Sequence, residues 1–330
     1  MNVGDFDGIR NSIDKALKAG QERDIGHEYE KDIEERYREE HRNPIPTPWP
    51  VFNELLQGGL GNGDFGLIFG NPGGGKSWTL IALGGEAVRL GYTVVHYTLE
   101  IDETYVGRRY DAFFTNIQAN QIKHHREEIE NIVPQIPGKL IIKDFSIKRA
   151  TMYTIESHLQ QLKDMGIEPD LIIIDYADLL KATSRSREKK DEIDIIYNDI
   201  KSTAKELQKP IWSVSQVNRE GAKEDVIEGT HAQGSYDKIF ITDFCVSLSR
   251  KKEDKVNGTG RFHIMKNRYG FDGMTYFAKI DTGTGHFEIE NEFVEENSEN
   301  NKKSNKTLLI ENFEPSEKNI LRQKFFELED

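Results

Sequence analysis

The segment that most constrains the fold of this chain is the glycine-rich stretch at residues 70–77. It reads Gly-Asn-Pro-Gly-Gly-Gly-Lys-Ser, which matches the pattern G-x-x-x-x-G-K-[ST] without a gap. The apolar run FGLIF precedes it, and the helix-like segment SWTLIALGGEAVRL follows. A strand, a glycine-rich turn and a helix N-terminus in this order cradle phosphate groups, so we predict a nucleoside triphosphate site. The alternative is a glycine-rich turn that matches by chance.

Each part of this loop has a predicted role. Its glycines let backbone N–H groups converge on phosphate oxygens, to which the helix N-terminus adds a favourable dipole. Lys76 would reach the β- and γ-phosphates, and the Ser77 hydroxyl would bind Mg²⁺. The residues predicted to bind ATP are Gly70, Asn71, Pro72, Gly73, Gly74, Gly75, Lys76, Ser77 and Trp78.

A second ligand for Mg²⁺ is predicted at the end of another strand. Residues 171–175 read LIIID, which is four apolar residues followed by Asp175. An aspartate in this setting holds the metal ion in phosphate-loop enzymes. A buried strand that ends in a solvated aspartate is the alternative, and the complete phosphate loop upstream disfavours it.

The catalytic carboxylate is expected on a neighbouring strand. Many phosphate-loop ATPases carry a glutamate directly after the metal-binding aspartate, but Tyr176 follows Asp175 here. Glu100 instead ends the run TVVHYTLE, just after the first crossover helix. The carboxyl end of an adjacent parallel strand would bring Glu100 near the γ-phosphate, where it could polarise water.

The apolar pattern from about residue 51 to 290 predicts an α/β fold. The runs that read as strands are FGLIFG, YTVVHYTLE, KLIIKDF, LIIIDY, PIWSVSQ and FCVSLSR. Helical segments such as 76–90 and 191–208 separate them, which favours a mostly parallel sheet covered by helices. Residues 261–268 and 275–282 read as later antiparallel strands. Cys245 lies in an apolar run and is expected in the core.

Three regions are expected along the chain. Residues 1–45 are polar and helix-prone, with narrow apolar stripes that should dock on another surface. The proline-rich segment NPIPTPWP marks a linker before an ATPase domain at 46–290. Residues 291–330 begin with a glutamate-rich stretch and read as an acidic, largely flexible tail.

Composition excludes several other classes of protein. The net charge of −13 argues against a uniformly basic nucleic-acid binder, although it does not exclude local basic patches. A single cysteine excludes a disulfide framework and a cysteine-based zinc site. No apolar run approaches the roughly 18 residues of a membrane span, so a soluble cytoplasmic protein is expected.

With Glu100 in this position, residues 44–290 resemble the RecA-like ATPase core of hexameric replicative helicases of the DnaB class. The upstream segment GHEYEKDIEERY is most similar to the tailed-phage members, which implies a phage protein in its host's cytoplasm. Residues 1–45 are too few for the N-terminal collar domain of these enzymes, so a chain without a collar is expected. The resemblance is carried by IPTPWPVFNELLQGGLGNGDFGLIFGNPGGGKS, TLEI with Arg108-Arg109, IIIDYADLL, KELQKPIWSVSQVNRE and Lys266-Asn267-Arg268-Tyr269-Gly270.

The resemblance implies roles for three further residues. Gln216 corresponds to the family's sensor glutamine, and Lys266 and Arg268 to cations that reach into the ATP site of the adjacent subunit. A cation supplied in trans would tie hydrolysis to assembly. Lys266 and Arg268 alternate on a predicted strand and would point to the same face. The alternative is a pair of solvated strand cations. Together with Glu100 and Lys76 they make up the predicted catalytic set.

Two loops are predicted to bind single-stranded DNA. In a RecA-like ring the loop after Asp175 and the loop at 218–235 both face the central channel, where positive charge would bind a phosphate backbone. The alternative is a solvated loop of mixed charge with no partner. The candidate DNA-binding residues are Lys181, Arg185, Arg187, Lys189, Lys190 and Arg219.

The sequence therefore predicts an ATP- and Mg²⁺-dependent helicase motor that assembles as a hexameric ring or helical homo-oligomer on single-stranded DNA. A primase, a loader or a single-strand-binding protein are expected as further partners. Two other functions share much of the pattern. One is a strand-exchange recombinase that forms filaments with the same core. The other is a regulatory ATPase that assembles around protein partners.

Overall fold

We analysed a computed structural model of the chain, which divides into two units, Met1–Arg42 and Asn43–Asp330. The described part of the first unit includes one short helix, α2 (Ile33–Arg36). The other elements described here belong to the second unit. The residues that the structure describes are 28–36, 42–145, 150–184, 189–218, 221, 224–229 and 236–293.

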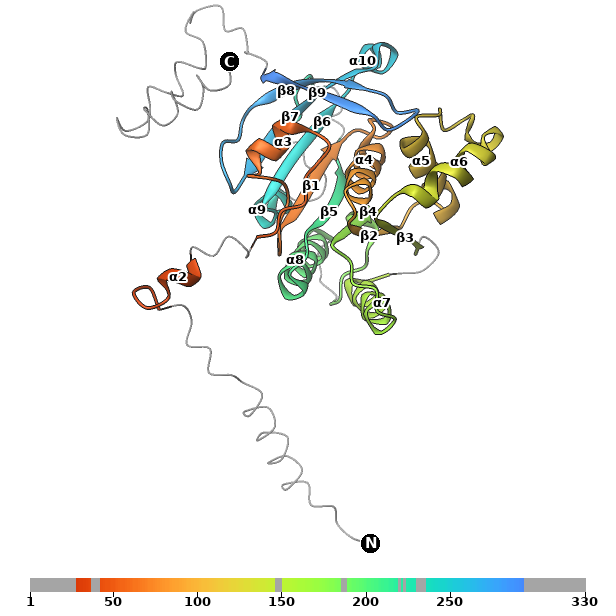
Figure 1. The fold of residues 1–330 in the computed structure, drawn as a ribbon. Coiled ribbons are helices and arrows are strands. Elements are labelled where there is room, and N and C mark those ends of the chain that lie inside the picture. The colour runs from red at the N-terminus through yellow and green to blue at the C-terminus, as the bar shows by residue number, and fades with distance from the viewer. Residues whose placement is uncertain are drawn as a thin grey trace, which may run out of the picture. The chain divides into compact units, whose positions relative to one another are not determined.

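A nine-stranded sheet runs through the second unit in the order β3-β2-β4-β5-β1-β6-β7-β8-β9 (Figure 1). The first six strands of this order are parallel to one another, and β7, β8 and β9 join them as an antiparallel extension. The strands are β1 (Phe65–Gly70), β2 (Thr93–Thr98), β3 (Lys139–Asp144), β4 (Leu171–Asp175), β5 (Ile211–Gln216), β6 (Phe244–Ser249), β7 (Thr259–Asn267), β8 (Thr275–Ile280) and β9 (Phe287–Phe293).

This architecture confirms the predicted mostly parallel sheet covered by helices. Each of the six apolar runs forms a strand of the parallel part. Residues 261–268 overlap β7, which begins two residues earlier, and residues 275–282 contain β8, its antiparallel partner. Cys245 is fully buried on β6, as expected for a core residue. Strands such as β1 and β4 are buried along their whole length because both faces of the sheet are covered.

The helices cover the two faces of the sheet as separate apolar layers. Side chains of α3, α4 and α5 pack on one face, and those of α7, α8 and α9 on the other. The helices are α3 (Pro50–Leu55), α4 (Lys76–Arg89), α5 (Glu103–Thr115), α6 (Arg126–Ile132), α7 (Met152–Asp164), α8 (Lys189–Leu207), α9 (Asp237–Ile241) and α10 (Lys252–Asn257), with short 3-10 turns η2 (Ile122–His124), η3 (Val133–Gln135) and η4 (Ala177–Leu179).

Alternation along the strands divides the core between the two faces. On β1, Ile68 packs in the layer of α4, while Leu67 and Phe69 pack in the layer of α8. Trp49, in the proline-rich segment, is buried in the α4 layer, and its indole Nε1 donates a hydrogen bond to the carbonyl of Phe287 at 3.0 Å. The segment predicted as a linker is therefore part of the core.

The parallel strands place their carboxyl ends along one edge of the sheet. Strand β1 lies between β5 and β6, and β4 lies between β2 and β5. The loops that follow β1, β2, β4 and β5 therefore leave the sheet side by side, which is where open α/β sheets bind ligands. No helix among the described residues is long and apolar enough to cross a membrane.

Candidate nucleotide site

The phosphate loop turns sharply between the end of β1 and the start of α4. Gly73 and Gly75 have φ angles of 64° and 109°, in the left-handed region where a side chain would be strained. The backbone N–H of Gly74 donates to the carbonyl of Asn71 at 2.9 Å and closes the turn. Helix α4 then begins at Lys76. The loop has the strand–turn–helix geometry that the sequence predicts.

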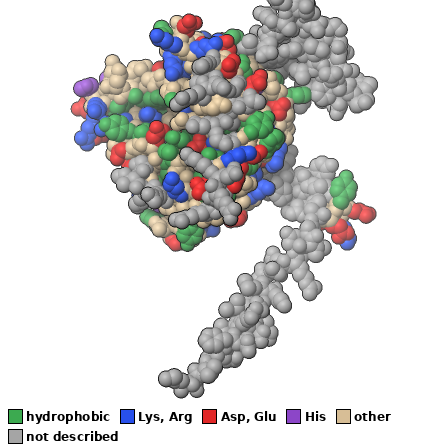
Figure 2. Space-filling model, turned by 180° about the vertical axis from the view of Figure 1, so that it is seen from behind, with side chains coloured by type: hydrophobic (Ala, Val, Ile, Leu, Met, Phe, Trp, Pro, Cys, Tyr) green, Lys and Arg blue, Asp and Glu red, His purple; other side chains and the backbone are tan. Residues whose placement is uncertain are grey.

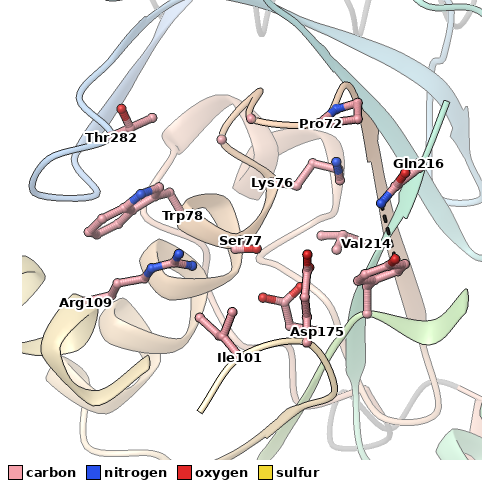
Figure 3. A pocket seen from close by; sticks show the side chains of 14 residues that line it. Pro72, Lys76, Ser77, Trp78, Ile101, Arg109, Asp175, Val214, Gln216 and Thr282 are labelled. Carbon is pink, nitrogen blue, oxygen red and sulfur yellow. Dashed lines mark hydrogen bonds between the residues drawn. The ribbon is translucent and has the colours of Figure 1, made fainter. Parts of the chain in front are cut away.

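A cavity of about 360 Å³ opens beside this loop (Figure 3). Predicted residues from three other segments also line this cavity. Glu100 follows β2, Asp175 ends β4 and Gln216 ends β5. Of the predicted loop residues, Pro72, Gly73, Gly75, Lys76, Ser77 and Trp78 line it. Gly70, Asn71 and Gly74 belong to the loop behind this lining. The remaining lining residues, which were not predicted, are Ile101, Arg109, Tyr176, Val214 and Thr282.

Lys76 is buried at the floor of the loop. Its Nζ donates to the carbonyl oxygens of Gly70 and Asn71 at 2.9 and 3.0 Å. Burial lowers its pKa to about 8, and the nearby carboxylates of Asp175 and Glu100 oppose that shift. At neutral pH the ammonium is therefore still mostly protonated. It is held by two neutral carbonyls that a phosphate oxygen could replace.

Asp175 is buried with unused hydrogen-bonding capacity. Burial raises its pKa, and a hydrogen bond from Ser77 and the charges of Arg109 and Lys76 oppose the shift. Its Oδ1 has no hydrogen-bond partner among the described residues. A buried carboxylate oxygen beside a serine hydroxyl fits a hard cation such as Mg²⁺, which prefers oxygen ligands.

The remaining ligands of such an ion would come from outside the protein. Within the described ranges, no group of three or more His, Cys, Asp or Glu side chains could hold a metal ion. Mg²⁺ usually uses one or two protein ligands together with phosphate oxygens and water. Ser77 and Asp175 thus fit a metal that is bound together with a nucleotide.

The Glu100 segment is held against the end of β4. The backbone N–H of Leu99 donates to the carbonyl of Asp175 at 2.7 Å, and the Thr98 hydroxyl donates to the carbonyl of Ile101 at 2.7 Å. The Asp102 side chain then caps α5 by accepting from the backbone N–H of Thr104. Glu100 itself is exposed in the lining of the cavity. This is the position that the sequence predicts for a carboxylate acting on water.

Arg109 is the site residue that the sequence analysis missed. It projects from α5, and its guanidinium carbon lies 5.5 Å from the centre of the Trp78 ring (Figure 3). Burial lowers its pKa, while Asp175 and Glu100 oppose the shift. The pair Arg108-Arg109 was visible in the sequence, but only the packing of α5 decides which of the two faces the cavity.

Gln216 contacts the residue next to the metal-binding aspartate. Its Nε2 donates to the Tyr176 hydroxyl at 3.3 Å, and both side chains line the cavity. A side chain at the end of β5 is therefore linked directly to the end of β4. The sensor role of Gln216 stays a prediction, to which this contact adds a direct link with the residue after Asp175.

Lys266 and Arg268 lie at the opposite edge of the sheet. Lys266 Nζ donates to the carbonyl of Phe240 at 2.6 Å, and Arg268 Nη1 forms an ion pair with Asp243 Oδ1 at 2.6 Å. The other carboxylate oxygen of Asp243 accepts from the backbone N–H of Phe65, the first residue of β1, at 2.8 Å. Neither cation lines the cavity of its own chain.

The expectation that both cations lie on one strand is wrong for Arg268. Strand β7 ends at Asn267, and Arg268 follows in a turn. The pairing of β6 with β7 shifts register between Cys245 and Val246, a bulge that local sequence does not reveal. Half of the Arg268 side chain, 53%, remains exposed.

The DNA-binding predictions are only partly within the described residues. Lys181 and Lys190 are exposed, and Lys190 forms an ion pair with Asp237 at 3.3 Å. Lys189 begins α8, and its side chain is outside the description, as are Arg185, Arg187 and Arg219. On the face shown in Figure 2, acidic and basic side chains are interspersed. The two loops leave the ends of β4 and β5, which are adjacent strands.

The sequence of this chain matches one protein family and is similar to known helicases. The family model described as the DnaB-like helicase C-terminal domain matches residues 45–277. A curated relative, the DnaB-like replicative helicase of Enterobacteria phage T4, is 22% identical over 281 residues. That match covers 81% of this chain and 59% of the relative, so the chain spans about three fifths of the relative's length.

Two solved structures share the fold. One, described as an ATPase domain, superposes with a TM-score of 0.64 at 19% identity, covering 87% of this chain and 99% of that domain. A DnaB-like replicative helicase, described with its interactions with primase, gives a TM-score of 0.67 at 18% identity, covering 86% of this chain and 71% of the helicase. These similarities establish the RecA-like ATPase fold of the second unit.

Proposed function

Because the chain belongs to the DnaB-like helicase C-terminal domain family, we propose that it is the ATP-hydrolysing motor of a replicative DNA helicase. The observation that carries the proposal is the cavity that joins the phosphate loop to Asp175, Glu100 and Gln216. These residues supply phosphate binding, metal binding, a carboxylate for water and a sensor contact in one place. A module that binds a nucleotide without hydrolysing it would need only the residues for phosphate binding and metal binding.

Binding of ATP would begin with Lys76. Its ammonium exchanges the carbonyls of Gly70 and Asn71 for oxygens of the β- and γ-phosphates, while the backbone of the loop holds the phosphate chain. Ser77 and Asp175 would hold Mg²⁺, which supplies charge neutralisation for the phosphates when bound. Arg109, stacked near Trp78, adds a buried positive charge beside both carboxylates.

Hydrolysis would use Glu100 as the group that orients water. The carboxylate accepts a proton from the water as its oxygen bonds to the γ-phosphorus. The bond between the γ-phosphorus and the oxygen it shares with the β-phosphate breaks, giving ADP and inorganic phosphate. Gln216 would respond to the loss of the γ-phosphate through Tyr176, since their side chains are hydrogen-bonded.

Assembly would complete the site. Lys266 and Arg268 are at the sheet edge opposite their own cavity, which supports a homo-oligomer in which they act on the neighbouring subunit's ATP. A hexameric ring or helical assembly puts each edge against the next cavity. Charge on the γ-phosphate would then be neutralised only at a subunit interface, so hydrolysis would require assembly.

The DNA site would lie on the loops that follow β4 and β5. Single-stranded DNA is the proposed track, and Lys181 and Lys190 are the described cations that flank the first loop. A primase is the proposed partner, because a structural relative of the same fold is described with one. The proposed setting is the cytoplasm, in keeping with the phage helicase to which the chain is similar.

Three assays test this function against its rivals: ATP hydrolysis, unwinding of a forked duplex and formation of D-loops. We expect ATPase activity that requires Mg²⁺, rises when single-stranded DNA is added, and accompanies unwinding of a forked duplex. Formation of D-loops without unwinding would indicate a strand-exchange recombinase instead. ATPase activity that single-stranded DNA does not change would indicate a regulatory ATPase. Lys76→Ala serves as the inactive control in each assay.

A further inference from the structure

A buried ion pair joins η4, which follows β4, to α9. Lys238, on α9, is fully buried, and its Nζ donates to Asp178 Oδ1 at 2.5 Å and to Ser215 Oγ at 3.0 Å. Burial lowers the pKa of Lys238, and the charge of Asp178 opposes the shift. Lysine is almost never fully buried unless it is paired. This pair therefore has a specific role in the fold or in the function.

The pair is part of a closed cluster of four side chains. Ser215 Oγ donates to Asp178 Oδ2 at 2.7 Å, and the Tyr197 hydroxyl donates to Asp178 Oδ1 at 3.0 Å. Lys238 Nζ also lies 4.9 Å from the centre of the Tyr197 ring, within cation–π range. Both oxygens of the carboxylate are thus occupied. Four elements, η4, β5, α8 and α9, meet at this one carboxylate.

Each member of the cluster is next to a functional segment. Asp178 comes three residues after Asp175, and Ser215 directly precedes Gln216. Tyr197 is on α8, which follows the first loop, and Lys238 is on α9, which follows the second. The cluster joins the strand ends that carry the nucleotide site to both helices that lead out of the candidate DNA loops.

The nucleotide side of the cluster is firmly anchored. Ser213 Oγ donates to the carbonyl of Ile174 at 2.7 Å and accepts from the backbone N–H of Ala177 at 3.1 Å. These bonds tie η4 to β4 and β5 together, so a shift of either strand end moves Asp178. On the loop side, α9 reaches the same carboxylate through the Lys238 side chain.

We propose that Asp178 and Lys238 are positioning residues that couple the nucleotide site to the DNA loop preceding α9. The inference rests on the proposed function and adds a specific route to it. Neither residue touches the nucleotide. The pair transmits a change at the ends of β4 and β5, where Asp175 and Gln216 are, to the start of α9. A hydrogen-bonded buried pair suits this task, because a buried polar network whose members are satisfied holds the elements it joins in one arrangement.

The main test replaces the pair by apolar side chains of similar size, Asp178→Leu with Lys238→Met. Such a replacement often preserves stability because it removes both charges together, but here the Tyr197 and Ser215 hydroxyls also lose their acceptor. Thermal unfolding therefore checks first that the variant is folded. We expect ATPase activity without DNA, and the KM for ATP, to stay within about twofold of wild type. Stimulation by single-stranded DNA is expected to fall about tenfold, in the upper range of effects of residues that carry coupling.

A matched control is available at the other end of the same strands. Lys209 and Glu168 form an ion pair at 3.6 Å just before β5 and β4. Glu168→Leu with Lys209→Met removes a lysine–carboxylate pair that joins these strands far from the nucleotide site. We expect DNA stimulation in this variant to equal that of wild type, since the pair contacts neither η4 nor α9.

The outcomes separate this inference from the proposed function. Wild-type ATPase that does not respond to single-stranded DNA defeats the proposed function. Wild-type stimulation that persists unchanged in a folded apolar-pair variant overturns the inference alone. If the apolar pair does not fold, Lys238→Gln takes its place, because it removes the ion pair but keeps a hydrogen-bond donor. Its DNA stimulation is expected to fall about threefold, and full stimulation in that variant likewise overturns the inference.

Discussion

Two buried aspartates at opposite edges of the same sheet have opposite surroundings. Asp243 has charged partners on both oxygens. Lys201 Nζ lies 2.5 Å from Oδ2, which also accepts from the backbone of Phe65, and Arg268 Nη1 lies 2.6 Å from Oδ1. The contact with Arg268 is an ion pair, because Oδ1 accepts no hydrogen bond within the described residues. Asp175 is equally buried, yet its Oδ1 is unpartnered within the part of the chain that the structure describes. Both oxygens of the first carboxylate are engaged by its own chain, and the second carboxylate is left for a ligand.

The difference shows that the two edges of one sheet have different roles. The carboxyl edge carries the proposed nucleotide site, and the amino edge holds Arg268 in place. At the carboxyl edge, Lys76 donates to two neutral carbonyls and Asp175 Oδ1 accepts no hydrogen bond within the described residues, so the proposed nucleotide and metal ion would give both groups charged partners. At the amino edge, Asp243 fixes Arg268 in place while leaving half of its side chain exposed. The proposed hydrolysis would require both edges, because the amino edge of one subunit would complete the nucleotide site at the carboxyl edge of its neighbour.

The largest expected effect comes from removing the cation at the carboxyl edge. Lys76→Ala should lower kcat for ATP hydrolysis at least about 10³-fold, because charge on the transferring phosphoryl group loses its buried partner. The fold should persist, since the lysine ammonium donates to neutral carbonyls. Steady-state ATPase assays and thermal unfolding measure the two effects. An active Lys76→Ala protein would contradict the assignment of the loop.

The next largest effect is a difference in protein stability between substitutions of the two aspartates. Asp243→Asn should lower the free energy of unfolding by about 3 kcal/mol, because it leaves the partly buried Lys201 without its charge partner. Asp175→Asn should raise it by about 1 kcal/mol, because it removes a carboxylate whose charged form burial disfavours. Denaturant unfolding at neutral pH without nucleotide measures both. Equal destabilisation by the two substitutions would refute the contrast.

The stability gain of Asp175→Asn should also depend on pH. The folded-state pKa of Asp175 is raised above its ordinary value, so the native state takes up its proton first as pH falls. The cost of the buried charge is therefore present above the raised pKa and is relieved as pH falls through it. The advantage of Asp175→Asn over wild type should shrink on acidification. A stability advantage of Asp175→Asn over wild type that grows as pH falls would contradict the predicted direction of the pH dependence.

The smallest expected effect concerns the protonation of Lys76. Its pKa of about 8 means that the ammonium loses its charge as pH rises through that value. The KM for ATP should therefore increase above about pH 8, whereas Lys76→Arg, which stays charged, should show no such inflection whatever its kcat. ATPase titrations from pH 6.5 to roughly 9.5 at saturating Mg²⁺ test this, and a flat KM in wild type would count against it.

The sequence was sufficient to predict residues whose place follows from strand order. Lys76, Ser77, Asp175, Glu100 and Gln216 all lie at or near the ends of strands, and the ends of parallel strands meet at one edge. A local motif and the order of the strands were enough to place them. This is why the cavity could be predicted from segments that are far apart along the chain.

Other residues depend on packing that the sequence does not encode locally. Arg109 enters the cavity because of how α5 packs, and Arg268 lies in the turn that follows the end of β7. The pair of Asp178 and Lys238 joins positions 60 residues apart whose charges gave no pattern. Arg185, Arg187 and Arg219 lie outside the described residues, so their predicted contacts with DNA stay predictions.

The central claim is that hydrolysis needs a cavity from one subunit and cations from the next. Mixing Lys76→Ala subunits with Arg268→Ala subunits tests it directly, because neither protein alone can form a complete site. If the site is shared, an Arg268→Ala cavity beside a Lys76→Ala neighbour is intact, and random mixing in equal amounts should restore up to about a quarter of wild-type ATPase activity. A mixture no more active than its separate components would contradict the shared site.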